Sequence, residues 1–260
     1  MRRQKQNSPE EITPQRIALR SSRIACLLGT VALLLVAAGT TISYFAMMAG
    51  NGRHRKLLLL FSVSNEWNIP AFFSAFLLFF AFLLLLFITI AAKKRKTASF
   101  QYWAILAFGF LIMAIDELCS LHEKLIPPMR TMLGNGPYGF FFFSWVIVAI
   151  PAVFILILLF IKFWWRLPVR TRLTFLIAAF VYLGGCLGFE LIGGYYLEKH
   201  GFLNMTFCFL EAIEESLEMG GAIIFIWGLL NTIEGNYQEE IRSLAGFIKR
   251  KTQNLIVSGR

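Results

Sequence analysis

The residues of this sequence best suited to chemistry are acidic side chains within long apolar segments. Eight of the 15 Asp and Glu residues fall in or at the ends of segments 100–121, 173–197 and 207–231, which contain no Lys or Arg. An ionised carboxylate deep in a bilayer is costly, so such residues usually mark a functional site. Together with one histidine they form a candidate metal-binding site: Asp116, Glu117, His122, Glu123, Glu190, Glu211, Glu214, Glu215 and Glu218.

The spacing of these residues places several of them on shared helix faces. From Glu211 to Glu218 the acids follow i, i+3/i+4, i+7 spacing, and Asp116 and Glu123 are also seven residues apart. Depths estimated from a rise of about 1.5 Å per residue place the acids of all three segments in the outer half of a hydrocarbon core about 30 Å thick. We therefore expect three helices to bring carboxylates to one layer of the membrane.

Carboxylates held close together cannot all stay ionised, because like charges repel. Since these segments contain no Lys or Arg, protons, a bound cation or a basic group from elsewhere must neutralise them. Carboxylates with a histidine suit Fe, Mn or Zn, whereas carboxylates alone suit Ca or Mg. Because of His122 we expect a divalent metal ion and favour Fe, Mn or Zn. The five-residue step from Glu117 to His122 departs from the Glu-x-x-His spacing of di-metal bundles, so a ferritin-like centre is not established.

Each of these residues also has a purely structural interpretation. Glu211 can stabilise the first turn of its helix through the helix dipole, and His122 and Glu123 can be solvated at the membrane interface. The deeper acids can stay protonated and hydrogen-bonded.

Three classes of function therefore remain open. The first is a metal-dependent membrane protein, in one form an enzyme acting on a lipid-like or quinone-like substrate. The second is a proton or cation transporter in which the acids form a relay or an ion site. The absence of matching acids in the cytoplasmic half of the spans, and of an inverted repeat, weakens this class. The third is a non-catalytic membrane subunit or scaffold. The sequence does not decide whether the protein is an enzyme.

The elements that must position these residues are transmembrane helices. The composition is 57% hydrophobic and only 15% charged, against about 25% charged in soluble domains. A water-soluble globule and a disordered chain are both excluded. We expect an all-α, polytopic membrane bundle of six transmembrane helices, since each apolar segment exceeds the roughly 18 residues that span a bilayer. The segments are 24–49, 70–92, 100–121, 139–163, 173–197 and 207–231.

The basic residues predict the orientation of the bundle. Of the 25 Lys and Arg residues, 19 lie in the N-terminal arm, after the second segment, between the fourth and fifth segments and in the C-terminal tail. The alternate loops hold the other 6. This asymmetry predicts that both termini are cytoplasmic. The basic residues are dispersed among membrane-flanking loops, so the expected partner is the lipid bilayer, with other membrane subunits possible, and not nucleic acid.

Three parts of the chain are distinguished by composition. Residues 1–23 form a basic cytoplasmic arm that we expect to be disordered, and residues 24–231 form the transmembrane domain. Residues 232–260 form a cytoplasmic tail whose apolar positions follow helical spacing, which predicts an amphipathic surface helix. Glycines at 184, 188, 193 and 194 predict that the fifth helix is thin on one side and central in the bundle.

Three motifs resemble a family of uncharacterised bacterial multipass membrane proteins. They are Asn68-Ile69-Pro70-x-x-Phe73-Ser74, Asp116-Glu117-x4-His122-Glu123 and Glu214-Glu215-x2-Glu218-Met219. The resemblance covers the second to sixth segments. It implies a bacterial integral membrane protein and does not imply an activity. The localisation that we expect is the inner (plasma) membrane, as a multi-pass protein.

Overall fold

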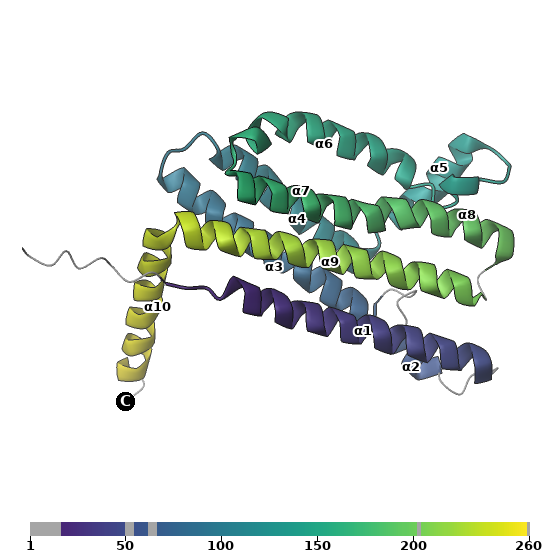
Figure 1. Ribbon diagram of the computed structural model, residues 1–260, viewed down its shortest axis with the longest axis horizontal. Coiled ribbons are helices and arrows are strands. Elements are labelled where there is room, and N and C mark those ends of the chain that lie inside the picture. Colours follow the sequence, from purple (N-terminus) through teal and green to yellow (C-terminus); the bar gives the residue numbers. More distant parts are fainter. Residues whose placement is uncertain (1–16, 50–54, 62–66, 202–203, 259–260) are drawn as a thin grey trace, which may run out of the picture.

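The computed structural model describes residues 17–49, 55–61, 67–201 and 204–258, and its elements in these ranges are helices, with no strand (Figure 1). The elements are α1 (Ser21–Ala49), α2 (Arg55–Phe61), α3 (Ile69–Lys94), α4 (Phe100–Cys119), η1 (Glu123–Leu125), α5 (Ile126–Leu133), η2 (Gly139–Phe141), α6 (Val146–Arg166), α7 (Val169–Leu183), η3 (Gly184–Phe189), α8 (Glu190–His200), α9 (Met205–Asn236) and α10 (Gln238–Ser258).

Six helical segments among the described residues are long and apolar enough to cross a membrane, which confirms the predicted six-helix membrane fold. The fifth span joins α7, the π-helical turn η3 and α8 into one segment, Val169–His200. The helix α6 is mostly exposed, with only Val146 and Phe163 buried along it. Such an apolar, outward-facing surface is what a lipid-contacting helix requires.

The fourth span begins at Val146, seven residues later than predicted. The preceding stretch is held by α8, because the Glu198 carboxylate accepts hydrogen bonds from the backbone N–H groups of Tyr138 and Gly139 at 2.6 and 2.7 Å. Hydrogen bonds to a charged acceptor are stronger than those between neutral groups. They favour the short 3-10 turn η2 over an extension of α6.

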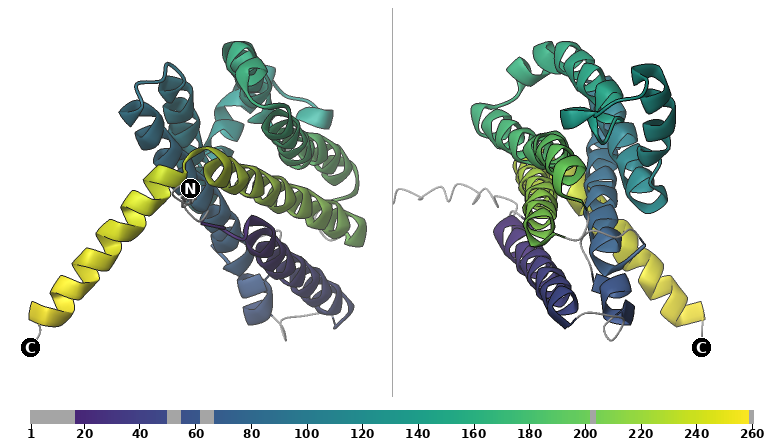
Figure 2. Two further views of the ribbon diagram at one scale, coloured as in Figure 1. Left: turned by 60° about the vertical axis from the view of Figure 1, so that its left-hand side comes forward. Right: turned by 90° about the vertical axis from the view of Figure 1, so that its right-hand side faces the viewer.

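The helix α9 occupies the centre of the bundle. It packs against α1, α3 and α7 (Figures 1 and 2). In its most apolar window 61% of the residues are buried, compared with 17% for the fifth span. Ile226 and Leu229 of α9 are fully buried and belong to the same hydrophobic core as α3 residues such as Leu85. The prediction that the fifth span is central is therefore wrong.

Two glycines of α9 explain its close packing with α7. A Cβ atom on Gly221 would lie 2.6 Å from the backbone nitrogen of Tyr182, and one on Gly228 would lie 2.9 Å from Phe175 Cε1. Since lipid tails are as apolar as the side chains they replace, membrane helices associate through such close contacts. Gly184 and Gly188, by contrast, face open space.

The helix α10 leaves the bundle at a steep angle to α9 (Figures 1 and 2). It confirms the predicted C-terminal helix. Gln238 in its first turn exchanges hydrogen bonds with the backbone of Ile17, at 2.9 Å and 3.0 Å. Beyond this contact α1 begins at Ser21, three residues earlier than predicted. Residues 1–16 of the predicted disordered arm lie outside the described residues.

Candidate functional site

Carboxylates from α4, α8 and α9 meet near the π-helical turn η3. Glu190 forms a side-chain hydrogen bond with Glu214. One helical turn further along α9, Glu218 interacts electrostatically with four other acids. They are Glu215 of α9, Glu117 and Asp116 of α4, and Glu190 of α8.

A small cavity lies among α3, α4, α7 and α9, and we call it the acidic cavity. Glu117, Glu218, Tyr182 and Ser74 contribute its polar lining. Its volume is ≈ 10 Å³, close to the roughly 10–15 Å³ needed for one water molecule. Ser74 is 94% buried, and its Oγ has no hydrogen-bond partner among the described residues. An unsatisfied buried hydroxyl is costly, so it indicates a position where a ligand atom is needed.

The turn η3 brings the fifth span close to the acids of α9. A Cβ atom on Gly185 would lie 2.8 Å from the carbonyl oxygen of Glu214 and 3.1 Å from Glu218 Cγ, so only glycine fits there without a shift. Cys186, the next residue, interacts electrostatically with Glu218 and Glu190. π-Helical turns inside α-helices are frequent at functional sites. Here the turn places Tyr182 and Glu190, on either side of it, against the same stretch of α9.

Trp145 contacts both the Glu190 carboxylate and the His122 ring. Its indole Nε1 donates a hydrogen bond of 2.7 Å to Glu190 Oε1. Its ring lies 4.9 Å, between centroids, from the imidazole of His122. The Glu190 carboxylate therefore has a neutral donor on one side and a second carboxyl group on the other.

Asp116 holds the turn that follows α4. Its carboxylate accepts a 2.8 Å hydrogen bond from the backbone N–H of His122 and lies 2.9 Å from His122 Nδ1. The chain reverses at Ser120, which has a left-handed conformation (φ 48°). The helix therefore ends at Cys119, and Glu123 begins a separate 3-10 turn. The seven-residue spacing of Asp116 and Glu123 does not place them on one helix.

The remaining candidates lie at the margin of this arrangement. Glu123 is exposed, and Glu211 is half-buried one turn before Glu214 on α9. The structure thus brings Glu117, Glu190, Glu214, Glu215 and Glu218 together with Asp116 at their edge. In the ranges that the structure describes, no group of three or more His, Cys, Asp or Glu side chains is placed to hold a metal ion.

Four residues of the site were not predicted from the sequence. Ser74 lies in a motif that carries the family resemblance, so that motif could have indicated it. Tyr182, Trp145 and Cys186 gave no comparable signal, because aromatic and small apolar residues are common throughout these spans. Their contacts depend on how the helices pack.

The fold and the site define a polytopic helical membrane protein with carboxylates of several spans gathered around one small cavity. A family model described as a domain of unknown function (DUF8692) matches residues 26–233. The protein belongs to this family, and the match covers all six spans apart from residues 21–25 of the first and residues 234–236 of the sixth. No curated protein and no solved structure matches the sequence.

Proposed function

We propose that this integral membrane protein binds protons or a small cation in the acidic cavity and transports that ion across the membrane. The observation that carries the proposal is the buried Ser74 hydroxyl, which lines the cavity beside Glu117 and Glu218 without a hydrogen-bond partner among the described residues. The cavity volume of ≈ 10 Å³ is far below the roughly 300–1,000 Å³ of sites for organic ligands. Its size therefore favours an ion over a lipid-like or quinone-like substrate.

The chemical groups that line the acidic cavity favour an ion as its ligand. Carboxylate and hydroxyl oxygens from Glu117, Glu218, Ser74 and Tyr182 are hard ligands of the kind that bind protons and hard cations. A cation in the cavity would also neutralise acids whose own spans contain no Lys or Arg. Glu190 and Glu214, which are hydrogen-bonded to each other beside Glu218, would supply a second, neighbouring protonation site for a relay.

We also propose that the protein lies in a plasma membrane with both termini on the cytoplasmic side. The loop after α3, the α6–α7 loop and the end of α9, where the C-terminal tail begins, line a single cavity, so these segments share one end of the bundle. The positive-inside rule assigns that end to the cytoplasm. The acids then face the outer half of the membrane.

Flux measurements in proteoliposomes test this proposal. Wild-type protein with a pH-sensitive or cation-sensitive dye inside the vesicles should give flux driven by a proton or cation gradient. Glu218→Gln should abolish the flux, because it removes the charge and keeps the shape. Glu239→Gln, at an exposed acid of α10, is the matched control and should retain it. Folded, oriented wild-type protein without any such flux would contradict transport and favour a non-catalytic subunit.

A divalent metal centre is the second candidate. One observation favours it: Asp116 holds His122 Nδ1 at 2.9 Å, and carboxylates orient metal-binding histidines in this way. The centre would be completed by rotation of the neighbouring Glu123 and would suit Fe, Mn or Zn. Elemental analysis of protein purified without chelators should find stoichiometric metal that is lost in His122→Ala and retained in His200→Ala. Metal-free, well-folded wild-type protein would exclude this candidate.

A further inference from the structure

A second cavity, distinct from the acidic cavity, opens at the end of the bundle where α10 begins. Its volume is ≈ 410 Å³, within the range of about 300–1,000 Å³ typical of small-molecule sites. We call it the arginine cavity. It is formed by the loop after α3, the start of α4, the α6–α7 loop and the end of α9.

The lining of the arginine cavity combines cationic, hydroxyl and aromatic groups. Arg95 and Arg166 contribute guanidinium groups, and Thr97 and Ser99 contribute hydroxyls. Trp103, which is 3% exposed, contributes to an aromatic wall. None of the described residues that line the cavity is acidic. Guanidinium groups match the geometry of phosphate oxygens, and hydroxyls supply further donors.

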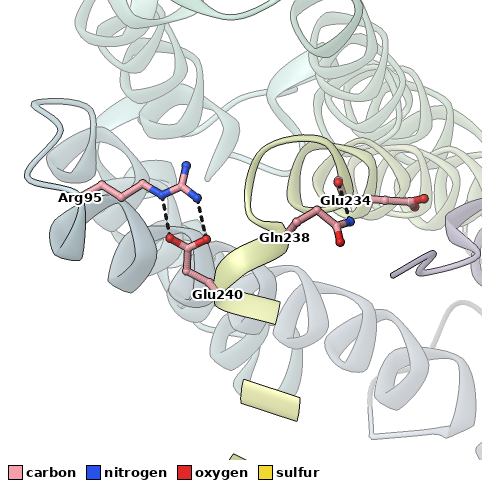
Figure 3. A network of polar contacts seen from close by, with 4 residues as sticks. All are labelled: Arg95, Glu234, Gln238 and Glu240. Carbon is pink, nitrogen blue, oxygen red and sulfur yellow. Dashed lines mark hydrogen bonds and ion pairs between the residues drawn. The ribbon is translucent and has the colours of Figure 1, made fainter. Parts of the chain in front are cut away.

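One guanidinium of this cavity is already paired with an anion. Arg95 Nε and Nη2 each donate a 2.7 Å hydrogen bond to the Glu240 carboxylate of α10 (Figure 3). The Arg95 guanidinium also lies 4.9 Å from the centre of the Tyr237 ring. Partial burial acts to raise the pKa of Glu240, but the hydrogen bonds and charge of Arg95 lower it below its ordinary value. The carboxylate is therefore ionised at neutral pH and occupies the donors that a phosphate would use.

We propose that the arginine cavity binds a phosphate group carried by an anionic phospholipid, and that Glu240 competes with this phosphate for Arg95. The cavity lies at the ends of membrane-spanning helices, where headgroups lie, and its aromatic wall suits the adjoining acyl and glycerol groups. Phosphate binding would release the contact between α3 and α10. The site shares no residue with the acidic cavity, so the inference does not depend on ion transport.

Lipid binding to the purified full-length protein tests this proposal. In phosphatidylcholine nanodiscs doped with phosphatidic acid or phosphatidylglycerol, native mass spectrometry should show retained anionic lipid on the wild-type protein. Arg166→Gln should weaken retention about tenfold, the effect of losing a hydrogen bond to a charged group. Arg170→Gln removes an equal charge from the same loop region, outside the cavity, and should leave retention unchanged. Glu240→Gln should strengthen retention by up to about fivefold, because it removes the competing carboxylate.

The remaining outcomes separate the alternatives. Equal retention of phosphatidylcholine and the anionic lipids would overturn the proposal, as would equal losses in Arg166→Gln and Arg170→Gln. Soluble glycerol 3-phosphate that binds tightly with the same dependence on Arg166, while the lipids do not, would keep the phosphate site and overturn its assignment to a lipid. Thermal unfolding of both arginine variants checks that any loss of binding does not reflect misfolding.

Discussion

Replacing Gly221 by alanine should push α7 away from α9 beside the acidic cavity. The new Cβ atom would lie 2.6 Å from the Tyr182 backbone nitrogen, 2.7 Å from its Cβ and 2.8 Å from its Cα. Optimal contacts between such atoms are about 3.5–4.0 Å. No side-chain rotation relieves a contact with backbone atoms, so α7 must move by about 1 Å.

The cost follows from these distances. Overpacking a tight interface usually costs about 1–3 kcal/mol, and alanine recovers about 1 kcal/mol through its higher helix propensity. Gly220→Ala is the matched control, because its Cβ atom would meet only Val181 Cγ1, at an ordinary 3.9 Å. Both variants gain the same propensity, so the Gly221 variant should be less stable than the Gly220 variant by about 1–3 kcal/mol.

Unfolding of the two variants in one detergent, by heat or by denaturant, measures this difference. The Gly221 variant should unfold at a lower midpoint. Added cations should also raise its midpoint less than they raise that of the Gly220 variant, because Tyr182 lines the acidic cavity. Equal midpoints would refute the packing of α7 on α9 and, with it, the proximity of Tyr182 to Glu218.

Three further predictions concern hydrogen bonds elsewhere in the structure. Trp145→Phe removes the indole donor of Glu190 and should destabilise the protein by about 1–3 kcal/mol; unchanged thermal unfolding would contradict this. Glu198→Ala removes the acceptor of two backbone N–H groups and should increase hydrogen exchange at residues 138–141, whereas no increase would show that the segment is held by other contacts. The Arg95–Glu240 pair should be fully formed above the ordinary glutamate pKa of about 4.3 and lost as pH falls through the lower pKa of Glu240 in the folded protein. Distances between spin labels on α3 and α10, measured as a function of pH, would report this release, and Glu240→Gln should abolish its pH dependence.

The membrane fold could be predicted from the sequence because the bilayer imposes a length and a polarity on each span. The boundaries of five spans were close to those observed, whereas the fourth began later. That difference depends on Glu198, a residue sixty positions away from Tyr138, whose hydrogen bonds give the intervening chain a different structure. A hydrophobicity pattern does not contain such long-range contacts.

The acidic cluster could be predicted in outline, because buried carboxylates without basic neighbours are conspicuous in an apolar sequence. Their pairing could not be predicted. Asp116 seemed equivalent to Glu117 by sequence, yet Ser120 ends the helix and leaves Asp116 bound to His122. The central role of α9 was also missed, because it depends on which glycines face a neighbour. Gly221 faces Tyr182 of the neighbouring helix and Gly184 faces open space, although both lie in similar apolar stretches of the sequence.

Direct measurement of ion binding at Glu218 tests the central claim, that the acidic cavity holds a proton or a small cation. Calorimetric titrations of the detergent-purified protein with protons, monovalent cations and divalent cations should show a saturable event in the wild type and in Glu239→Gln. The same event should be absent in Glu218→Gln and in Glu117→Gln. Titrations that are identical for the wild type and Glu218→Gln would contradict the claim.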